Sequence, residues 1–171
     1  MIDLILLRHA DASTAGKDGN GRDEERPLSS RGMAQSRRAA AAIREWGIQI
    51  NAILASPYLR TRQTAECVAA SLHTGIRPVL CPDLLPEADP AGILNTLSSD
   101  PPGDRILLVG HQPQLGNILS CLFPSPEAAE IALPLAAMAR ISVTHSGADP
   151  AYRLESIVPP DRYPAEPRSC R

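Results

Sequence analysis

The residues of this sequence best suited to chemistry are two histidines that directly follow apolar segments. His9 comes after residues 2–8 (IDLILLR), and His111 comes after residues 105–110 (RILLVG). A neutral imidazole can act as a nucleophile or carry a proton near neutral pH. Arg8 closes the first apolar segment, where a guanidinium is costly to desolvate unless an anion accompanies it. Because a guanidinium can bind two oxygens of a phosphate at once, these residues favour phosphoryl chemistry.

Arg60 is a second guanidinium that we expect to point toward such a site. It lies four residues before Thr64, at the head of the helical row that Thr64, Cys67 and Val68 are expected to bury. A surface arginine would normally lie on the opposite face, so Arg60 should extend over the edge of the sheet. The amide groups and the dipole at that helix N-terminus also favour an anion. With Arg8 and the two histidines, Arg60 predicts a compact cationic pocket.

Each of these side chains also has a simpler interpretation. A single histidine after a strand is more often a hydrogen-bonded structural group than a catalyst. Arg8 could pair with a carboxylate such as Asp11. Two histidines at equivalent positions, together with two inward arginines, favour the phosphate pocket over these alternatives.

The elements that must position these residues alternate between strands and helices along the chain. Apolar runs, caps and prolines predict the alternation. The expected strands are 2–8, 51–55, 76–81, 105–110, 137–144 and 151–158, and the last two are compatible with a hairpin around Ser146-Gly147. The expected helices start at Ser29 or Ser30, Ser56-Pro57, Asp89-Pro90 and Pro113. This order predicts an α/β sandwich with a largely parallel central sheet. Since ligands bind at the carboxyl ends of such strands, the four candidate residues can converge there.

Length and composition set the outer limits on function. The 171 residues suit one domain, which we place at 1–158 and which a proline-rich tail at 159–171 follows. Within the domain, the composition of residues 11–26 predicts a flexible polar loop. A net charge of -2 and 3% aromatic residues do not favour a nucleic-acid partner. No apolar run approaches the roughly 20 residues that span a bilayer. We therefore expect a cytoplasmic monomer that binds neither nucleic acid nor membrane.

The motifs of nucleotide-dependent and metal-dependent phosphoryl transfer are missing from the sequence. It contains no GxxxxGK[ST] loop, no GxGxxG and no carboxylate cluster suited to magnesium. The four cysteines are widely spaced without a CxxC pair, so we expect reduced thiols rather than a zinc site or disulfides. The sequence predicts chemistry with no cofactor and no metal.

Five sequence blocks resemble the histidine phosphatase superfamily, which is phosphoglycerate mutase-like in fold. They look most like its small SixA-type phosphohistidine phosphatases, and they occur in the family's order. The blocks are LLRHADA at 6–12, RPLSSRG at 26–32, SPYLRTRQT at 56–64, LLPEAD at 84–89 and LLVGHQPQLG at 107–116. The resemblance implies a three-layer α/β/α sandwich, in agreement with the independent strand pattern.

The resemblance also implies a role for each candidate residue. His9 would be the nucleophile, and Arg8, Arg60 and His111 would hold the phosphoryl oxygens. Glu87 falls where larger relatives often carry an acidic proton donor, although the match is partial and an exposed loop glutamate is an equal alternative. Asp11 is a poorer second candidate for that acid. At position 10 many members have glycine and this chain has alanine.

Three functions remain open on these grounds. The first is dephosphorylation of phosphohistidine in a signalling or phosphotransfer protein. The second is hydrolysis of a small phosphate ester. The chain between Thr64 and Ile106 leaves little length for a lid, which favours an open site and a protein-borne phosphate. The third is a non-catalytic phosphate-binding module, against which the presence of a nucleophilic His9 argues.

Overall fold

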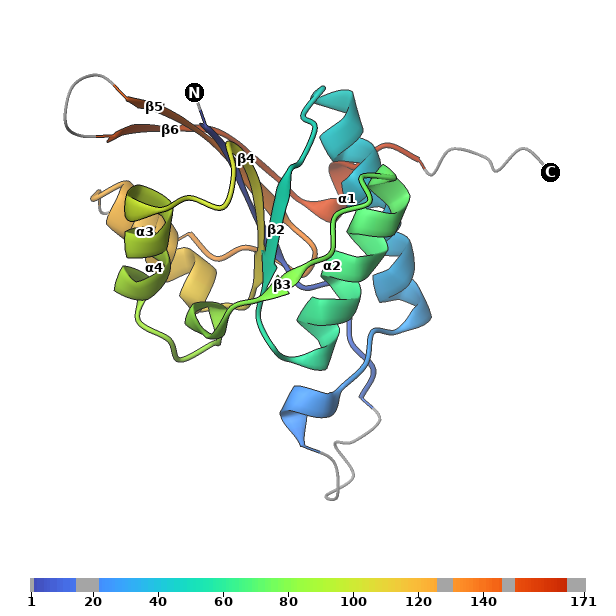
Figure 1. The fold of residues 1–171 in the computed structure, drawn as a ribbon. Coiled ribbons are helices and arrows are strands. Elements are labelled where there is room, and N and C mark those ends of the chain that lie inside the picture. The colour runs from blue at the N-terminus through green and yellow to red at the C-terminus, as the bar shows by residue number, and fades with distance from the viewer. Residues whose placement is uncertain (1, 15–21, 126–130, 146–149, 166–171) are drawn as a thin grey trace.

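A six-stranded sheet lies between two pairs of helices in the computed structural model, which describes residues 2–14, 22–125, 131–145 and 150–165 (Figure 1). The elements are β1 (Ile2–Arg8), α1 (Ser30–Glu45), β2 (Ala52–Ala55), α2 (Leu59–Leu72), β3 (Val79–Leu80), α3 (Pro90–Ser99), β4 (Arg105–Gly110), α4 (Gln114–Leu122), β5 (Met138–His145) and β6 (Pro150–Val158). The fold class is the α/β sandwich that the sequence predicts.

The sheet has the strand order β3-β2-β4-β1-β5-β6. β1, β4, β2 and β3 pair in parallel, whereas β5 is antiparallel to both β1 and β6. The central sheet is therefore mixed but largely parallel, as expected. The turn between β5 and β6, predicted around Ser146-Gly147, falls outside the described residues.

Two hydrophobic cores fill the spaces on either face of the sheet. Successive strand residues point to opposite faces, so Ile5 and Leu7 pack under α1 and α2 while Leu4 and Leu6 pack under α3 and α4. β4 repeats this alternation along the same two faces. Because both faces are covered, β1 and β4 read as continuous apolar runs rather than alternating ones.

Capping residues set the starts of two helices as the sequence indicates. The Ser29 side chain accepts a hydrogen bond from the Gly32 amide at the start of α1, and Asp89 caps α3 with Pro90 at its first position. Helix α2, by contrast, begins at Leu59 with Tyr58 as its N-cap, two residues later than the expected Pro57. The proline lies in the turn that leaves β2.

Two further expectations are wrong in detail. The predicted strand 76–81 is reduced to Val79–Leu80, an exposed two-residue edge strand. Cys67 was expected on the buried row of α2, but it is only half-buried beside α1, while Thr64 and Val68 are fully buried. The buried stripe of this helix therefore runs one position away from the cysteine.

The chain remains packed on the domain beyond residue 158. Tyr163 is buried and its hydroxyl donates to the Ala136 carbonyl, while Arg38 of α1 donates to the carbonyl oxygens of Tyr163 and Pro164. Part of the proline-rich segment thus contributes to the core under α1. In the described part of the chain, no helix combines the length and apolar character needed to cross a membrane.

Candidate active site

Three adjacent parallel strands end at one edge of the sheet, and a polar residue follows each of them. The residues are His9 after β1, His111 after β4 and Ser56 after β2. The His9 amide donates to the Gly110 carbonyl at 2.9 Å, and the Ser56 amide donates to the Val109 carbonyl at 3.0 Å. The strand register therefore places these three side chains side by side.

The two histidines and Arg60 converge at this edge, as the sequence predicts. The ring centroids of His9 and His111 lie 5.1 Å apart. Arg60, in the first turn of α2, donates its Nε–H to His9 Nε2 at 3.3 Å and an Nη2–H to His111 Nδ1 at 3.4 Å. All three side chains are buried, so the guanidinium provides a positive charge in a place with little water.

The hydrogen bonds of His9 fix its tautomer. Its Nδ1–H donates to the Ala10 carbonyl at 2.9 Å, and since Arg60 Nε can only donate, Nε2 must carry the lone pair. Desolvation, and then the charges of Arg60, Arg8 and Arg26, lower the pKa of His9 to about 4, although the Ala10 carbonyl opposes the shift. The ring is neutral at physiological pH, with Nε2 ready to act as a nucleophile.

Ser56 positions the other histidine. His111 Nδ1 accepts from Arg60, so the neutral ring carries its proton on Nε2, which donates to Ser56 Oγ at 2.9 Å. Desolvation, and then His9 and Arg60, lower the pKa of His111 to about 3, against an opposing contribution from Asp23. Sequence reasoning treated Ser56 only as a helix cap; its position directly after a strand was the available signal for this role.

Arg8 lies beside the histidines with part of its hydrogen-bonding capacity unused. Its Nη1–H donates to the Leu133 carbonyl at 2.8 Å, while its buried Nε has no partner in the part of the chain that the structure describes. Burial, and then the charge of Arg60, lower the pKa of Arg8. A buried N–H without an acceptor is costly, and an anion in the cleft is the kind of group that would satisfy it.

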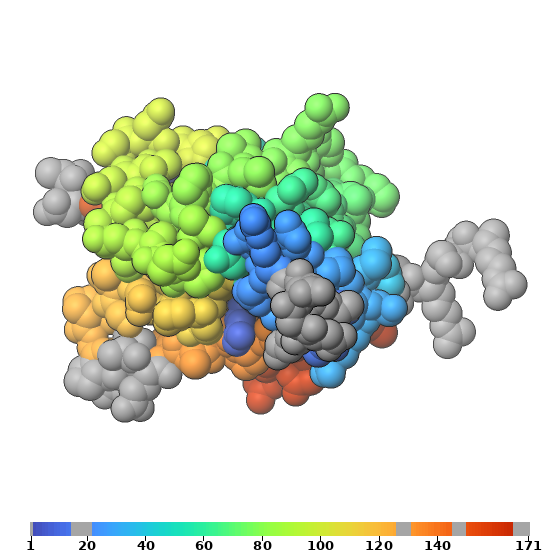
Figure 2. All heavy atoms as spheres, turned by 90° about the horizontal axis from the view of Figure 1, so that it is seen from below, coloured from blue at the N-terminus to red at the C-terminus, as the bar shows by residue number. Residues whose placement is uncertain are grey.

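The cleft at this edge has a volume of about 510 Å³. Its lining includes Arg8, His9, Asp11, Ala12, Thr14, Asp23, Arg26, Arg60, Pro86, His111, Gln112 and Leu135. Seen from the end where the parallel strands finish, the segment of the 3-10 turn Asp23–Glu25 (blue) stands over these strand ends, beside the teal spheres around the start of α2 (Figure 2). Sequence reasoning missed Asp23 and Arg26 because they lie in the polar segment read as a flexible loop.

Side chains of α1 and α2 hold the backbone that lines the cleft. The Ala10 amide donates to Thr64 Oγ1 at 3.2 Å, and the Asp11 amide donates to Gln35 Oε1 at 2.9 Å. Gly32 lies so close to the Asp11 carbonyl oxygen that a β-carbon there would collide with it. The segment after β1 is thus fixed against the two helices, which positions the backbone carbonyl that orients His9.

The two candidate acids are placed differently from the histidines and arginines. Glu87 is exposed and does not line the cleft, although the neighbouring Pro86 does. Asp11 lines the cleft, but its carboxylate accepts a hydrogen bond from Ser29 Oγ at 2.5 Å. The acidic proton donor therefore stays a prediction. Within the described ranges, no group of three or more His, Cys, Asp or Glu side chains could hold a metal ion.

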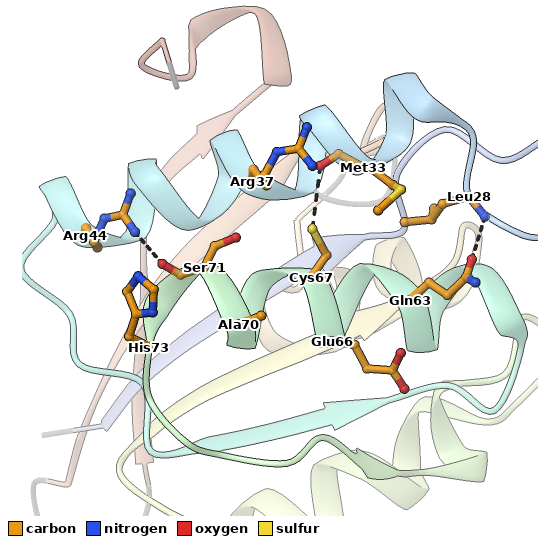
Figure 3. Close-up of a pocket in the computed structure, with 10 residues that line it drawn as sticks. All are labelled: Leu28, Met33, Arg37, Arg44, Gln63, Glu66, Cys67, Ala70, Ser71 and His73. Atoms are coloured by element: carbon orange, nitrogen blue, oxygen red, sulfur yellow. Dashed lines mark hydrogen bonds between the residues drawn. The ribbon is translucent and has the colours of Figure 1, made fainter. Parts of the chain in front are cut away.

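A hollow larger than this cleft lies between α1 and α2. It measures about 710 Å³ and is lined by Leu28, Met33, Arg37, Arg44, Gln63, Glu66, Cys67, Ala70, Ser71 and His73. In Figure 3 the Cys67 thiol approaches the Met33 carbonyl across it, and Arg44 donates to the Ser71 carbonyl. None of the four candidate catalytic residues lines this hollow, so its size does not make it the reaction site.

Comparison with known proteins agrees with the fold and identifies the class of protein as a phosphatase. Residues 4–89 match the family model of the histidine phosphatase superfamily (branch 1). The chain belongs to this superfamily. An uncharacterized protein of Picosynechococcus sp. (strain PCC 7002) is 34% identical over 118 residues, covering 68% of this chain and 70% of that protein. The phosphohistidine phosphatase SixA of Escherichia coli (strain K12) is 28% identical over 126 residues, covering 72% and 75%.

Solved structures share the fold over almost the whole chain. The protein histidine phosphatase SixA complexed with tungstate superposes with a TM-score of 0.78 at 24% identity, covering 94% of this chain and 98% of that one. A mycobacterial glucosyl-3-phosphoglycerate phosphatase superposes with a TM-score of 0.67 at 16% identity, covering 91% and 98%. The same fold therefore occurs in phosphatases of different substrates.

Proposed function

We propose that this chain is a metal-independent phosphatase that forms a transient phosphohistidine on His9 and that its substrate is phosphohistidine in a signalling or phosphotransfer protein. One observation carries the proposal. His9 is buried and neutral, its Nδ1–H is held by the Ala10 carbonyl, and its Nε2 lone pair faces the guanidinium of Arg60. A binding module needs cations but does not need a nucleophilic nitrogen oriented in this way.

The first step is attack by His9 Nε2 on the phosphorus of the bound phosphoryl group. A bond forms between Nε2 and phosphorus while the bond from phosphorus to the substrate nitrogen breaks, and that nitrogen leaves with its electron pair and takes up a proton. Water then attacks the phosphorus of the phosphoenzyme. Inorganic phosphate is released and the His9 ring regains its lone pair. No oxidant, nucleotide or metal enters either step.

Arg8, Arg60 and His111 would offset the charge on the phosphoryl oxygens. Catalysis of phosphoryl transfer is largely a matter of positioning and charge stabilisation, and losing one such donor typically costs about 3 kcal/mol, or about a hundredfold in rate. The Nε–H of Arg8 has no acceptor among the described residues. This supports the role, because a phosphoryl oxygen would supply an acceptor.

The carboxylates of the cleft favour a phosphohistidine substrate over an ester. Asp11 is tied to Ser29, and the hydrogen bond from Arg26 and the charge of Arg60 lower the pKa of Asp23. With its pKa lowered, the Asp23 carboxyl group is not poised to donate a proton at neutral pH. An alkoxide leaving group needs such an acid, whereas a phosphorus–nitrogen bond breaks readily once the leaving nitrogen is protonated.

The openness of the site points in the same direction. The chain between α2 and β4 forms β3, a short turn and α3, and α3 packs on the opposite face of the sheet from α1 and α2 (Figure 1). This segment supplies only Pro86 to the lining of the cleft. A site that the described chain between α2 and β4 leaves uncapped can receive a phosphoryl group carried on a protein surface.

Hydrolysis of a small phosphate ester is the second candidate. The structural likeness to the glucosyl-3-phosphoglycerate phosphatase keeps it open, because that enzyme has the same fold. The deciding experiment compares kcat/KM for a phosphohistidine protein with kcat/KM for a panel of alkyl and aryl phosphate esters. We expect a clear preference for phosphohistidine. Higher kcat/KM for an ester would reverse the choice of substrate.

The role of His9 is tested separately with His9→Asn. This variant should turn over no substrate. It should also lack the covalent phosphate that quenching without acid traps on the wild-type protein, which is labile in acid and stable in base. His73→Asn is the matched control, because His73 is exposed in a left-handed conformation that asparagine adopts readily. Retained activity in His9→Asn would refute the nucleophile assignment. Chelator should leave the wild-type rate unchanged, and a large loss would indicate a metal.

A further inference from the structure

Arg60 already holds an anion in this structure. Its Nη2–H donates to the Asp23 carboxylate at 2.9 Å and its Nη1–H donates to the Asp23 backbone carbonyl at 2.7 Å. The same guanidinium donates to His9 Nε2 and to His111 Nδ1. Every nitrogen of the guanidinium therefore has a protein partner, and the lone pair of the nucleophile is engaged as well.

A phosphoryl group needs the same donors. To receive in-line attack from His9 Nε2 it must lie against Arg60, where the Asp23 carboxylate now sits at the edge of the cleft. Two anions bound to one guanidinium repel each other, and the repulsion is strong where water is scarce. Phosphoryl binding and the Asp23–Arg60 ion pair are thus in competition.

The two partners of this ion pair differ in their freedom to move. The Arg60 side chain is 7% exposed, whereas the Asp23 side chain is 61% exposed. Asp23 belongs to the short 3-10 turn Asp23–Glu25 and has a second partner in Arg26, whose Nη1 lies 3.0 Å from its other carboxylate oxygen. Asp23 can therefore leave Arg60 toward solvent while its charge stays paired.

We propose that Asp23 is a competing anion built into the site, which occupies Arg60 in the free enzyme, yields to the phosphoryl group of the substrate and returns to displace inorganic phosphate. The inference rests on the phosphate binding of the proposed function. It assigns to Asp23 a role in setting affinity for phosphate and in product release. It also explains why the exposed 3-10 turn Asp23–Glu25 reaches back to the strand ends.

Asp23→Asn tests the proposal, because asparagine keeps the size and an acceptor oxygen but removes the charge. Titration calorimetry with inorganic phosphate measures the dissociation constant for the wild-type protein, for Asp23→Asn and for Glu25→Gln. Glu25→Gln is the matched control, since Glu25 is an exposed carboxylate of the same turn and does not line the cleft. Asp23→Asn should bind phosphate about fivefold to tenfold more tightly, as expected for removal of one partly exposed charge-assisted contact. Glu25→Gln should match the wild type.

A second readout follows the product during turnover. Inhibition by inorganic phosphate should become stronger in Asp23→Asn by the same factor, and Asp23→Ala should behave like Asp23→Asn. Unchanged or weaker phosphate binding in both variants would overturn the inference and would make Asp23 a residue that merely holds Arg60 in place. If the folded wild-type protein bound no phosphate at all, both this inference and the proposed function would fall.

Discussion

His9 should remain uncharged far below the pH at which an ordinary histidine takes up a proton. The ring is buried beside two arginines, and burial with these charges lowers its pKa to about 4. At pH 5 an unperturbed imidazole with a pKa of about 6.5 is only about 3% neutral. With a pKa of about 4 the ring would be about 90% neutral at the same pH. The nucleophile should therefore be available across the whole range in which most histidines titrate.

Nitrogen NMR of the histidine side chains measures both the protonation state and the tautomer. Two-bond proton–nitrogen spectra recorded in phosphate-free buffer from pH 8 to about pH 5 should show one ring that keeps the neutral Nδ1–H tautomer throughout. The hydrogen bond to the Ala10 carbonyl requires that tautomer. The His9→Asn variant identifies the resonance by its loss. A midpoint between pH 6 and 7, or an Nε2–H tautomer for this ring, would refute the reasoning.

The same pKa shift has a consequence for stability. Between pH 6.5 and about pH 4 the unfolded chain binds a proton at His9 that the folded protein does not, so stability falls as the pH falls through this window. The shift from 6.5 to about 4 corresponds to about 3 kcal/mol for this residue once the pH is below 4. Urea unfolding at several pH values should show a smaller acid loss in His9→Asn. An identical loss in both proteins would contradict the shift.

Three further variants probe the surroundings of the site. Ser56→Ala removes the acceptor for the His111 ring and should lower kcat/KM about tenfold while the fold is kept. Ser98→Ala, at an exposed serine, is the control. An unchanged rate in Ser56→Ala would show that Ser56 has no role in the site. Glu87→Gln should leave ester hydrolysis unchanged because Glu87 is exposed outside the cleft, whereas a general acid would contribute about a hundredfold or more. Gly32→Ala forces a β-carbon against a backbone carbonyl and should lower the free energy of unfolding by about 2 kcal/mol in urea titrations; an unaltered midpoint would mean that the loop after β1 adjusts freely.

The sequence predicts the central strands and the convergence of His9, His111 and Arg60, because both leave local signals. β1 and β4 are buried on two faces, so each is a continuous apolar run with a polar residue at its end. Arg60 is recognisable from its helical phase relative to Thr64. In each case the signal lies within a few residues of the side chain that it predicts.

The remaining features depend on contacts between distant segments. The sheet order places β4 between β1 and β2, and this order alone brings His111 between His9 and Ser56. Asp23 lies in a polar stretch whose composition carries no signal of its ion pair with a helix 37 residues further along the chain. Neither arrangement could be read from periodicity, because periodicity reports only which face of an element is buried.

The two histidines are alike in burial but differ in what holds them. The Ala10 carbonyl can only accept a hydrogen bond, so it fixes the proton of His9 on Nδ1 and leaves Nε2 as a lone pair. Ser56 Oγ can donate or accept, so it can pair with Nε2 in either tautomer of the His111 ring. A phosphoryl dianion next to His111 favours a proton on Nδ1, which the ring can acquire without losing its serine partner. The carbonyl therefore supports the proposed role of His9 as the nucleophile, and the hydroxyl supports the proposed role of His111 as a donor in the same cleft.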